Sequence, residues 1–291
     1  MRTVTITDSG AISTFDVHCF GSGSPHIVFT AGVHGNEYGG IYVAERLLEL
    51  FSKNPPQKGT VTIIPRCNPA ASRCGTRRSP FDSVDMNRIF PGDEKSSITH
   101  KVAAALWTET ADADYIVDLH CCGQHGTPYI LSTFEEHPKA GALAQMITLD
   151  VVIRSEGTPG QLFTTSCRER GQAALVIEIP SGPATGAIHE AATEQVYQGV
   201  LDMLRGMEVL PSQVRGSSPV FYGPLCDVNA PEAGLWKPSA CRGTIADQGH
   251  VLGRMGDQDV VMPEKGVVMA VRPKGYLFTD DLWAVIYAPA L

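Results

Sequence analysis

The sequence predicts an α/β fold in which a mixed, mostly parallel sheet carries helices on both faces, followed by a small all-β unit. The first observation is that short apolar runs rich in Val and Ile alternate with longer segments of helical periodicity, as expected for strands buried on both faces. The second is that this periodicity stops past about residue 208. The predicted strands are HIVFTA (26–31), TVTIIP (60–65), DYIVDL (114–119) and ALVIEIP (174–180).

Helices are expected between these strands, over residues 39–53, 97–110 and 187–206. The first of them spaces its apolar side chains for one face of a helix, at Ile41, Ala44, Leu47, Leu48 and Phe51. No internal repeat of solenoid length occurs. A chain of 291 residues is long enough for one large α/β domain with a smaller second domain.

The tail is predicted from short β-like pieces that recur between turn residues, namely GLWKP, GHVLGRMG, GVVMAVRPKG and WAVIYAP. We expect an α/β domain over residues 1–208 and a β-rich domain over 209–291, with the stretch MEVLPSQVRGSSPVF fitting either side. A lipoyl- or biotin-carrier domain would present a lysine, typically flanked by methionine, at a hairpin tip. Lys265 has no adjacent methionine, so we interpret the tail as a structural or gating module.

Composition limits the class of function. Hydrophobic residues make up 43% and charged residues 19% of the chain, and the formal net charge of −8 argues against a general nucleic-acid binder. The N-terminus has no apolar signal-peptide core and no apolar run is long enough to span a membrane, so we expect a cytoplasmic protein. The eight cysteines form no CxxC motif and are expected to be reduced thiols.

Polar residues follow the predicted strands at the ends where α/β sheets bind ligands. His34 and Glu37 stand three apart in the glycine-rich turn AGVHGNEYGG, and His120 ends DYIVDLH. Two histidines and a carboxylate are the ligand set of a catalytic zinc site with an open fourth position. Because HxxE is a short motif, a second interpretation stays open, in which His34 bonds a backbone group and Glu37 caps the next helix.

His120 lies in the segment DLHCC. Asp118 shares its face of the strand and can orient a metal-bound imidazole. The alternative is a core histidine without a ligand role. Cys121 and Cys122 are soft ligands nearby, but a cysteine-rich site is typically closed and structural, so His120 is preferred.

Glu178 is a charged residue inside the apolar strand ALVIEIP. Burying a carboxylate is costly unless it has a partner or a task. It is therefore either paired with an arginine or a general base for a metal-bound water, with a pKa raised by partial desolvation.

Five arginines occur in RCNPAASRCGTRRSPFDSVDMNR (66–88), together with Asn68 and Asn87. They are either a surface charge cluster or a substrate site. In a site, one arginine can stabilise an oxyanion and another can bind a carboxylate through paired hydrogen bonds.

The motifs GVHGNEYGG, NPAASRCGTRRSPFDSVDMNRIFPG, DLH and VIEIPSG, in that order, resemble the succinylglutamate desuccinylase/aspartoacylase family. The resemblance covers roughly residues 25–205, and the β-rich tail resembles that family's C-terminal domain. The family is related to the zinc carboxypeptidases, which implies an α/β/α sandwich. It also implies one Zn²⁺ per chain, held by His34, Glu37 and His120, in a zinc-dependent catalytic domain.

The resemblance further implies roles for the remaining polar residues. Glu178 matches the general base, and Arg77 matches an arginine that polarises the substrate carbonyl. Asn87 and Arg88 match the pair that holds the substrate carboxylate, and we place Asn68 in the same substrate-binding group. Two residues depart from the family pattern, because Met86 replaces a more common leucine and Arg78 stands where an aromatic residue is often found. A second carboxylate-binding arginine has three candidates, Arg154, Arg168 and Arg170.

We therefore predict a zinc-dependent hydrolase that cleaves the amide bond of an N-acyl amino acid or a related small molecule. In this hypothesis zinc activates a water, Glu178 accepts its proton, and Arg77 stabilises the oxyanion. The rivals are a metallocarboxypeptidase acting on a short or unusual peptide and a small-molecule-binding protein with a vestigial site. The acyl group, the amine and the oligomeric state, including a homo-oligomer, stay open.

Overall fold

The computed structural model describes residues 1–182, 186–212, 218–278 and 283–291. Its larger part is a nine-stranded sheet in the order β1-β2-β4-β3-β5-β8-β6-β7-β9. The strands of this sheet are β1 (Arg2–Asp8), β2 (Ala11–Ser22), β3 (His26–Ala31), β4 (Gly59–Ile64), β5 (Tyr115–Cys121), β6 (Tyr129–Ser132), β7 (Val151–Arg154), β8 (Ala173–Ile179) and β9 (Val220–Tyr222).

The large sheet is mixed and mostly parallel, as predicted. The pairs β4–β3, β3–β5, β5–β8, β6–β7 and β7–β9 are parallel, and the pairs β1–β2, β2–β4 and β8–β6 are antiparallel. The carboxyl ends of β3, β5 and β8 therefore lie side by side at one edge. This is the edge at which the predicted site residues emerge.

Helices cover both faces of the sheet. They are α1 (Tyr38–Lys53), α2 (Pro69–Cys74), α3 (Ile98–Glu109), α4 (Pro138–Met146), α5 (Leu162–Arg170) and α6 (Glu190–Gly206), with a 3₁₀ turn, η1, at Met86–Arg88. Successive residues of a strand point to opposite faces, and β3 divides accordingly. Ile27 and Phe29 pack with α1 and α6, whereas Val28 packs with α3 and α5. The predicted α/β/α sandwich is confirmed.

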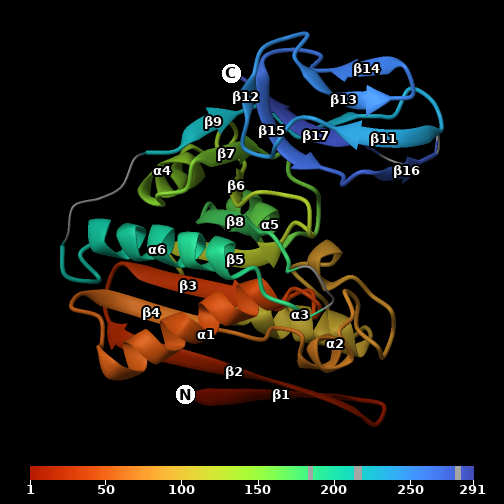
Figure 1. Cartoon of the computed structure of the whole chain (residues 1–291). Helices are drawn as coiled ribbons and strands as arrows, with labels where there is room; N and C mark the ends of the chain where they lie inside the picture. Colours follow the sequence, from red (N-terminus) through yellow and green to blue (C-terminus); the bar gives the residue numbers. More distant parts are fainter. Residues whose placement is uncertain (183–185, 213–217, 279–282) are drawn as a thin grey trace.

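The C-terminal part contains two antiparallel sheets of four strands, in the orders β10-β17-β15-β12 and β14-β13-β11-β16. Trp236 is fully buried at the centre of their shared core. The strands are β10 (Cys226–Val228), β11 (Gly234–Pro238), β12 (Ile245–Ala246), β13 (Val251–Met255), β14 (Gln258–Val261), β15 (Gly266–Val271), β16 (Gly275–Leu277) and β17 (Val285–Pro289). In Figure 1 these strands, in blue, lie at the opposite end of the molecule from the β1–β2 hairpin.

The boundary at 208/209 stays a prediction. Strand β9 lies beyond it in sequence yet joins the large sheet through β7. Part of the stretch that fits either side, residues 213–217, lies outside the described residues. None of the helices in the described ranges combines the length and hydropathy that a transmembrane segment needs.

The connection between β5 and β6 contacts the C-terminal sheets directly. Gly126 forms an antiparallel bridge with Ala270, and the Thr127 amide donates to the Met269 carbonyl over 3.2 Å. The Arg242 guanidinium donates to the Gly126 carbonyl over 2.9 Å. The segment that follows the predicted ligand His120 therefore connects two strands of the large sheet and is also hydrogen-bonded to the C-terminal sheets.

Candidate metal centre and active site

The turn after β3 brings His34 and Glu37 inward. Both side chains are buried, at 2% and 6% exposure. A Cβ atom on Gly35 would lie 2.0 Å from the Ala71 carbonyl carbon, so the turn packs against α2 more closely than any other residue allows. Glu37 precedes α1 in the N-cap position, but its carboxylate makes no capping hydrogen bond. The interpretation of Glu37 as a helix cap is wrong.

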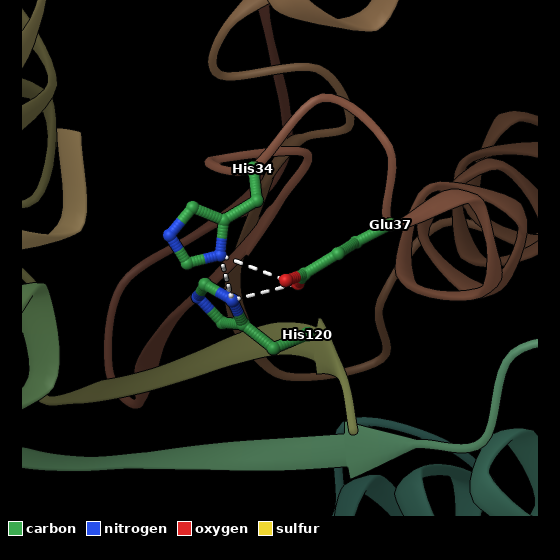
Figure 2. A group of neighbouring side chains, drawn as sticks. All are labelled: His34, Glu37 and His120. Atoms are coloured by element: carbon green, nitrogen blue, oxygen red, sulfur yellow. Dashed lines mark hydrogen bonds and ion pairs between the residues drawn. The ribbon is translucent and has the colours of Figure 1, made fainter. Parts of the chain in front are cut away.

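His120 completes a group of three with these side chains, as Figure 2 shows. Glu37 Oε1 lies 2.8 Å from His34 Nδ1, and Glu37 Oε2 lies 2.9 Å from His120 Nδ1. The two Nδ1 atoms are 3.2 Å apart. The two Nδ1 atoms and the two Glu37 carboxylate oxygens thus face one point, although His120 is far from His34 and Glu37 in sequence.

Two further carboxylates orient the histidine rings from outside. Asp85 Oδ1 accepts from His34 Nε2 over 2.9 Å, and Asp118 Oδ2 accepts from His120 Nε2 over 2.8 Å. Thr30 donates its hydroxyl to the other Asp118 oxygen over 2.7 Å. Each Nε2 proton is therefore committed to a carboxylate, which leaves each Nδ1 facing inward, as in metal-bound histidines.

This donor set fits one cation. Two imidazole nitrogens 3.2 Å apart need a proton or a metal ion between them, and ligand atoms about 2.1 Å from a tetrahedral ion lie about 3.4 Å from each other. Within the described residues, His34, Glu37 and His120 form the one group of this kind, with ligand atoms within 4.8 Å of one another. Nitrogen and carboxylate ligands suit Zn²⁺.

The electrostatics of the site also call for positive charge. Burial acts to lower the pKa of His120, but Asp118 and Glu37 outweigh it and raise that pKa well above its usual value. Burial acts to raise the pKa of Glu37, but His120 and His34 outweigh it and hold that pKa below its usual range. Without a metal ion, the raised pKa of His120 favours its protonated form, which offsets part of the negative charge of Glu37 and Asp118.

Glu178 lies beside this group on β8, in register with His120 on β5. Burial raises the pKa of Glu178 to about 7, against the opposing effect of His120. Its Oε2 atom is buried and has no hydrogen-bond partner among the described residues. Glu178 forms no ion pair within the described ranges, so the interpretation that it pairs with an arginine finds no support there.

Arg77 lies at the rim of the site. Its Nε donates to Asp85 Oδ2 over 3.0 Å, and a terminal nitrogen lies 3.5 Å from Glu37 Oε1. The side chain is 44% exposed, so it is accessible to a molecule that enters from solvent. The structure thus places the predicted carbonyl-polarising arginine next to the metal-binding group.

Asn87 and Arg88 lie on the η1 turn that Asp85 begins. Asn87 is buried and its Oδ1 accepts from the Leu162 amide over 3.0 Å, which fixes the turn to the start of α5. Arg88 is exposed and donates to the Asn87 carbonyl over 2.7 Å. Arg88 is therefore the more accessible member of this predicted substrate pair.

Asn68 caps α2, because its Oδ1 accepts from the Ala71 amide over 3.2 Å. Its Nδ2 is buried without a hydrogen-bond partner in the described part of the chain. The candidates for a second carboxylate-binding arginine have other partners. Arg154 pairs with Glu135, Arg168 with Glu136, and Arg170 stacks on Trp107.

Asp85 is the site residue that the sequence analysis missed. It is 51 positions from His34, and its importance comes from the three groups that it contacts rather than from any motif. The segment DMN offers one signal, since an aspartate that accepts from the amide two residues later is a common turn. That signal predicts a turn and says nothing about a metal ligand.

Taken together, the α/β sandwich and the buried histidine–glutamate group at its strand ends define a protein of the aspartoacylase type. The family model "Succinylglutamate desuccinylase/Aspartoacylase catalytic domain" matches residues 23–207. The chain belongs to this family, as its motifs predicted.

One curated relative is similar in sequence, and two solved structures share the fold. The N-alpha-acetyl-L-2,4-diaminobutyric acid deacetylase of Halomonas elongata is 27% identical over 248 residues, which cover 80% of this chain and 71% of the relative. An aspartoacylase family protein from Mesorhizobium loti superposes with a TM-score of 0.80, with 22% identity over 100% of this chain and 95% of that one. A product-bound structure of the ectoine utilization protein EutE (DoeB) from Ruegeria pomeroyi gives a TM-score of 0.78, with 21% identity over 99% and 94%.

Proposed function

We propose that this protein is a zinc-dependent hydrolase that cleaves the amide bond of an N-acyl amino acid or a related small molecule. The observation that carries the proposal is the group of His34, Glu37 and His120 with Glu178 on the adjacent strand. A metal-binding group and a carboxylate of raised pKa, side by side, are the parts that amide hydrolysis by water requires.

The ion would be held by His34, Glu37 and His120. When bound, it supplies Lewis acidity towards the substrate carbonyl and lowers the pKa of a water molecule beside it. Glu178 accepts a proton from the attacking water as the new C–O bond forms. Glu178 then transfers that proton to the amine nitrogen as the C–N bond breaks, which releases a carboxylate and an amine. A carboxylate whose pKa is about 7 is suited to both transfers near neutral pH.

The arginines and asparagines serve binding and charge stabilisation. Arg77 donates to the carbonyl oxygen as negative charge develops on it, where one such donor is worth about 10²–10³ in kcat. Arg88 and Asn87 hold the carboxylate of the amino acid and so fix its register. Asn68 Nδ2 donates to the substrate, a role supported by the lack of a partner for that buried atom in the described part of the chain. The candidate substrate is therefore a small molecule that carries a carboxylate.

The named activity of one relative supports the choice of an N-acyl amino acid over a peptide. The Halomonas elongata protein is named as a deacetylase of an acetylated diamino acid, and the match covers most of both chains. The identity of the acyl group and of the amine is left to experiment, because small changes in a pocket shift such preferences by only about 1–3 kcal/mol per group.

The test is release of primary amine from N-acetyl, N-formyl and N-succinyl amino acids, from N-α-acetyl-2,4-diaminobutyrate and from dipeptides, with and without a chelator. We expect chelator-sensitive release from at least one N-acyl amino acid, restored by Zn²⁺. Release from dipeptides alone would instead identify a carboxypeptidase. Metal-loaded protein that binds these compounds without turnover would identify a vestigial site.

A further inference from the structure

Asp85 connects the metal-binding group to the substrate-binding turn. Its Oδ1 accepts from His34 Nε2 over 2.9 Å and from the Asn87 amide over 3.1 Å, and its Oδ2 accepts from Arg77 Nε over 3.0 Å. The Asp85 side chain is only 13% exposed. One carboxylate thus contacts a predicted metal ligand, the predicted carbonyl-binding arginine and the turn that carries Arg88.

Asp118 provides an internal comparison. It bonds the other histidine at a nearly equal distance, 2.8 Å from His120 Nε2. Its second oxygen accepts from Thr30 on the neighbouring strand β3, and the side chain is completely buried. Asp118 is therefore held within the sheet, whereas the second oxygen of Asp85 is engaged by Arg77 at the rim.

The turn that holds Asp85 is fixed from its far side by the start of α5. Asn87 Oδ1 accepts from the Leu162 amide, and the Phe90 amide donates to the Gly160 carbonyl over 3.0 Å. A Cβ atom on Gly160 would lie 2.1 Å from the Arg88 carbonyl oxygen. The turn is thus attached to the metal-binding group by Asp85 and to the body of the protein by α5.

We propose that Asp85 is a positioning residue with two separable roles, and that Asp118 has only one. Both carboxylates orient a histidine ring for the metal ion. Asp85 also holds Arg77 and the Asn87–Arg88 turn in register with the ion, so that the carbonyl and the carboxylate of a substrate are bound at a fixed separation. The second role rests on the proposed function, whereas the attachment of the turn does not.

The variants Asp85→Ala, Asp85→Asn and Asp118→Asn separate these roles. Loss of either carboxylate is expected to weaken metal binding about 10–100-fold, measured by competition with a chromophoric chelator. Asp85→Asn keeps one acceptor oxygen, so it cannot serve both His34 and Arg77 and is expected to be intermediate. Thermal unfolding of each variant checks that the fold is retained.

Two further measurements distinguish the aspartates. At saturating Zn²⁺, Asp85→Asn is expected to raise KM about tenfold with a smaller change in kcat, whereas the matched Asp118→Asn leaves KM near the wild-type value. Amide hydrogen exchange of peptides that cover residues 76–90 is expected to accelerate in Asp85→Asn and not in Asp118→Asn. The exchange measurement needs no substrate.

Equal KM values and equal exchange in the two variants would overturn the proposal, because Asp85 would then only support a ligand as Asp118 does. Unchanged metal affinity in Asp85→Ala would overturn it as well. If the wild-type protein releases no amine from any compound, the proposed function fails, while metal competition and hydrogen exchange still decide the attachment of the turn.

Discussion

His120 and Glu178 are directly paired residues on the parallel strands β5 and β8. Neighbouring strands lie about 4.8 Å apart, so the sheet itself fixes the separation between a predicted metal ligand and the predicted base. The next strand, β6, begins at the same level, with Tyr129 paired to Glu178 on the other side. The carboxylate is therefore held in the centre of the sheet, where burial raises its pKa.

Replacement of Glu178 by glutamine tests its role as the base. The variant keeps the shape and hydrogen-bonding capacity of the side chain but cannot accept the proton, so we expect kcat to fall by at least about 10²-fold. Metal content, measured on the purified protein by mass spectrometry, should be unchanged because Glu178 is not among the three ligands. Loss of the metal together with activity would instead make Glu178 a structural residue.

The pH dependence of turnover should show an acidic limb that belongs to Glu178. The base must be ionised, so kcat falls as the pH drops below the pKa of Glu178. That pKa is about 7 without a metal ion, and a nearby cation favours the ionised form, so the limb should lie at or below this value. A pH–rate profile from 4.5 to 9 at saturating Zn²⁺ measures it. A limb well above pH 7 would assign it to another group.

The free energy of unfolding of the metal-free protein should also depend on the ionisation of Glu178, and it should fall as the pH rises. The pKa of Glu178 is raised in the folded state, so the neutral form stabilises the fold at low pH and this contribution is lost as the pH rises through about 7. Glu178→Gln should therefore gain about 2 kcal/mol over wild type between pH 5 and pH 8. Urea unfolding in the presence of a chelator gives the comparison, and a constant difference across pH would contradict it.

Gly35 is expected to tolerate no side chain. A Cβ atom there would lie 2.0 Å from the Ala71 carbonyl carbon and 2.2 Å from the Ser72 nitrogen, and helix backbone cannot yield cheaply. Gly35→Ala should cost about 1–3 kcal/mol and displace His34, with weaker metal retention during dialysis. Gly275→Ala is the matched control, because the nearest atom to its Cβ is 3.8 Å away. Equal melting temperatures for the two variants would show that the turn can move.

Arg77→Ala should lower kcat about 10²–10³-fold at unchanged metal content, because it removes a donor aimed at the developing oxyanion. Arg73, in the last turn of α2, is the control for the loss of one positive charge from the same segment. Steady-state kinetics on the preferred substrate compare the two variants. A similar loss of activity in both would indicate a general effect of charge on the encounter with the substrate carboxylate.

Strong local patterns allowed four of the nine strands of the large sheet to be predicted. Strand β3 begins and ends at the predicted residues, and β4, β5 and β8 lie within two residues of the predicted bounds, because each is an uninterrupted apolar run between turns. Strands β6, β7 and β9, of three or four residues each, and helices α4 and α5 were not predicted. The β1–β2 hairpin was not predicted either. It lies at the edge of the sheet, and β2 exposes every second residue, so its apolar content is diluted by polar residues such as Asp16 and His18.

Some residues of the candidate site could also be predicted from the sequence, and others could not. The grouping of His34, Glu37, His120 and Glu178 at one end of the sheet could be predicted, because each is a polar residue at the end of an apolar strand or inside one. The cap that Asn68 makes with the Ala71 amide is local, three residues on, but was not recognised in the sequence. The contact of Asn87 could not be predicted, since it depends on where the distant Leu162 amide lies after folding. Asp85 belongs to the same class. An aspartate in a polar loop is common in sequences, and its contact with His34 forms only when the chain folds.

The bridge between Gly126 and Ala270 has a consequence for how the protein would lose the proposed metal ion on heating. The chain that leaves His120 is hydrogen-bonded to β15 within a few residues, so melting of the C-terminal sheets would free one wall of the metal centre. Heat tolerance of the centre is then limited by a part of the protein that supplies none of its ligands. Substitutions that stabilise the C-terminal sheets should thus also raise the temperature at which the proposed centre releases its ion.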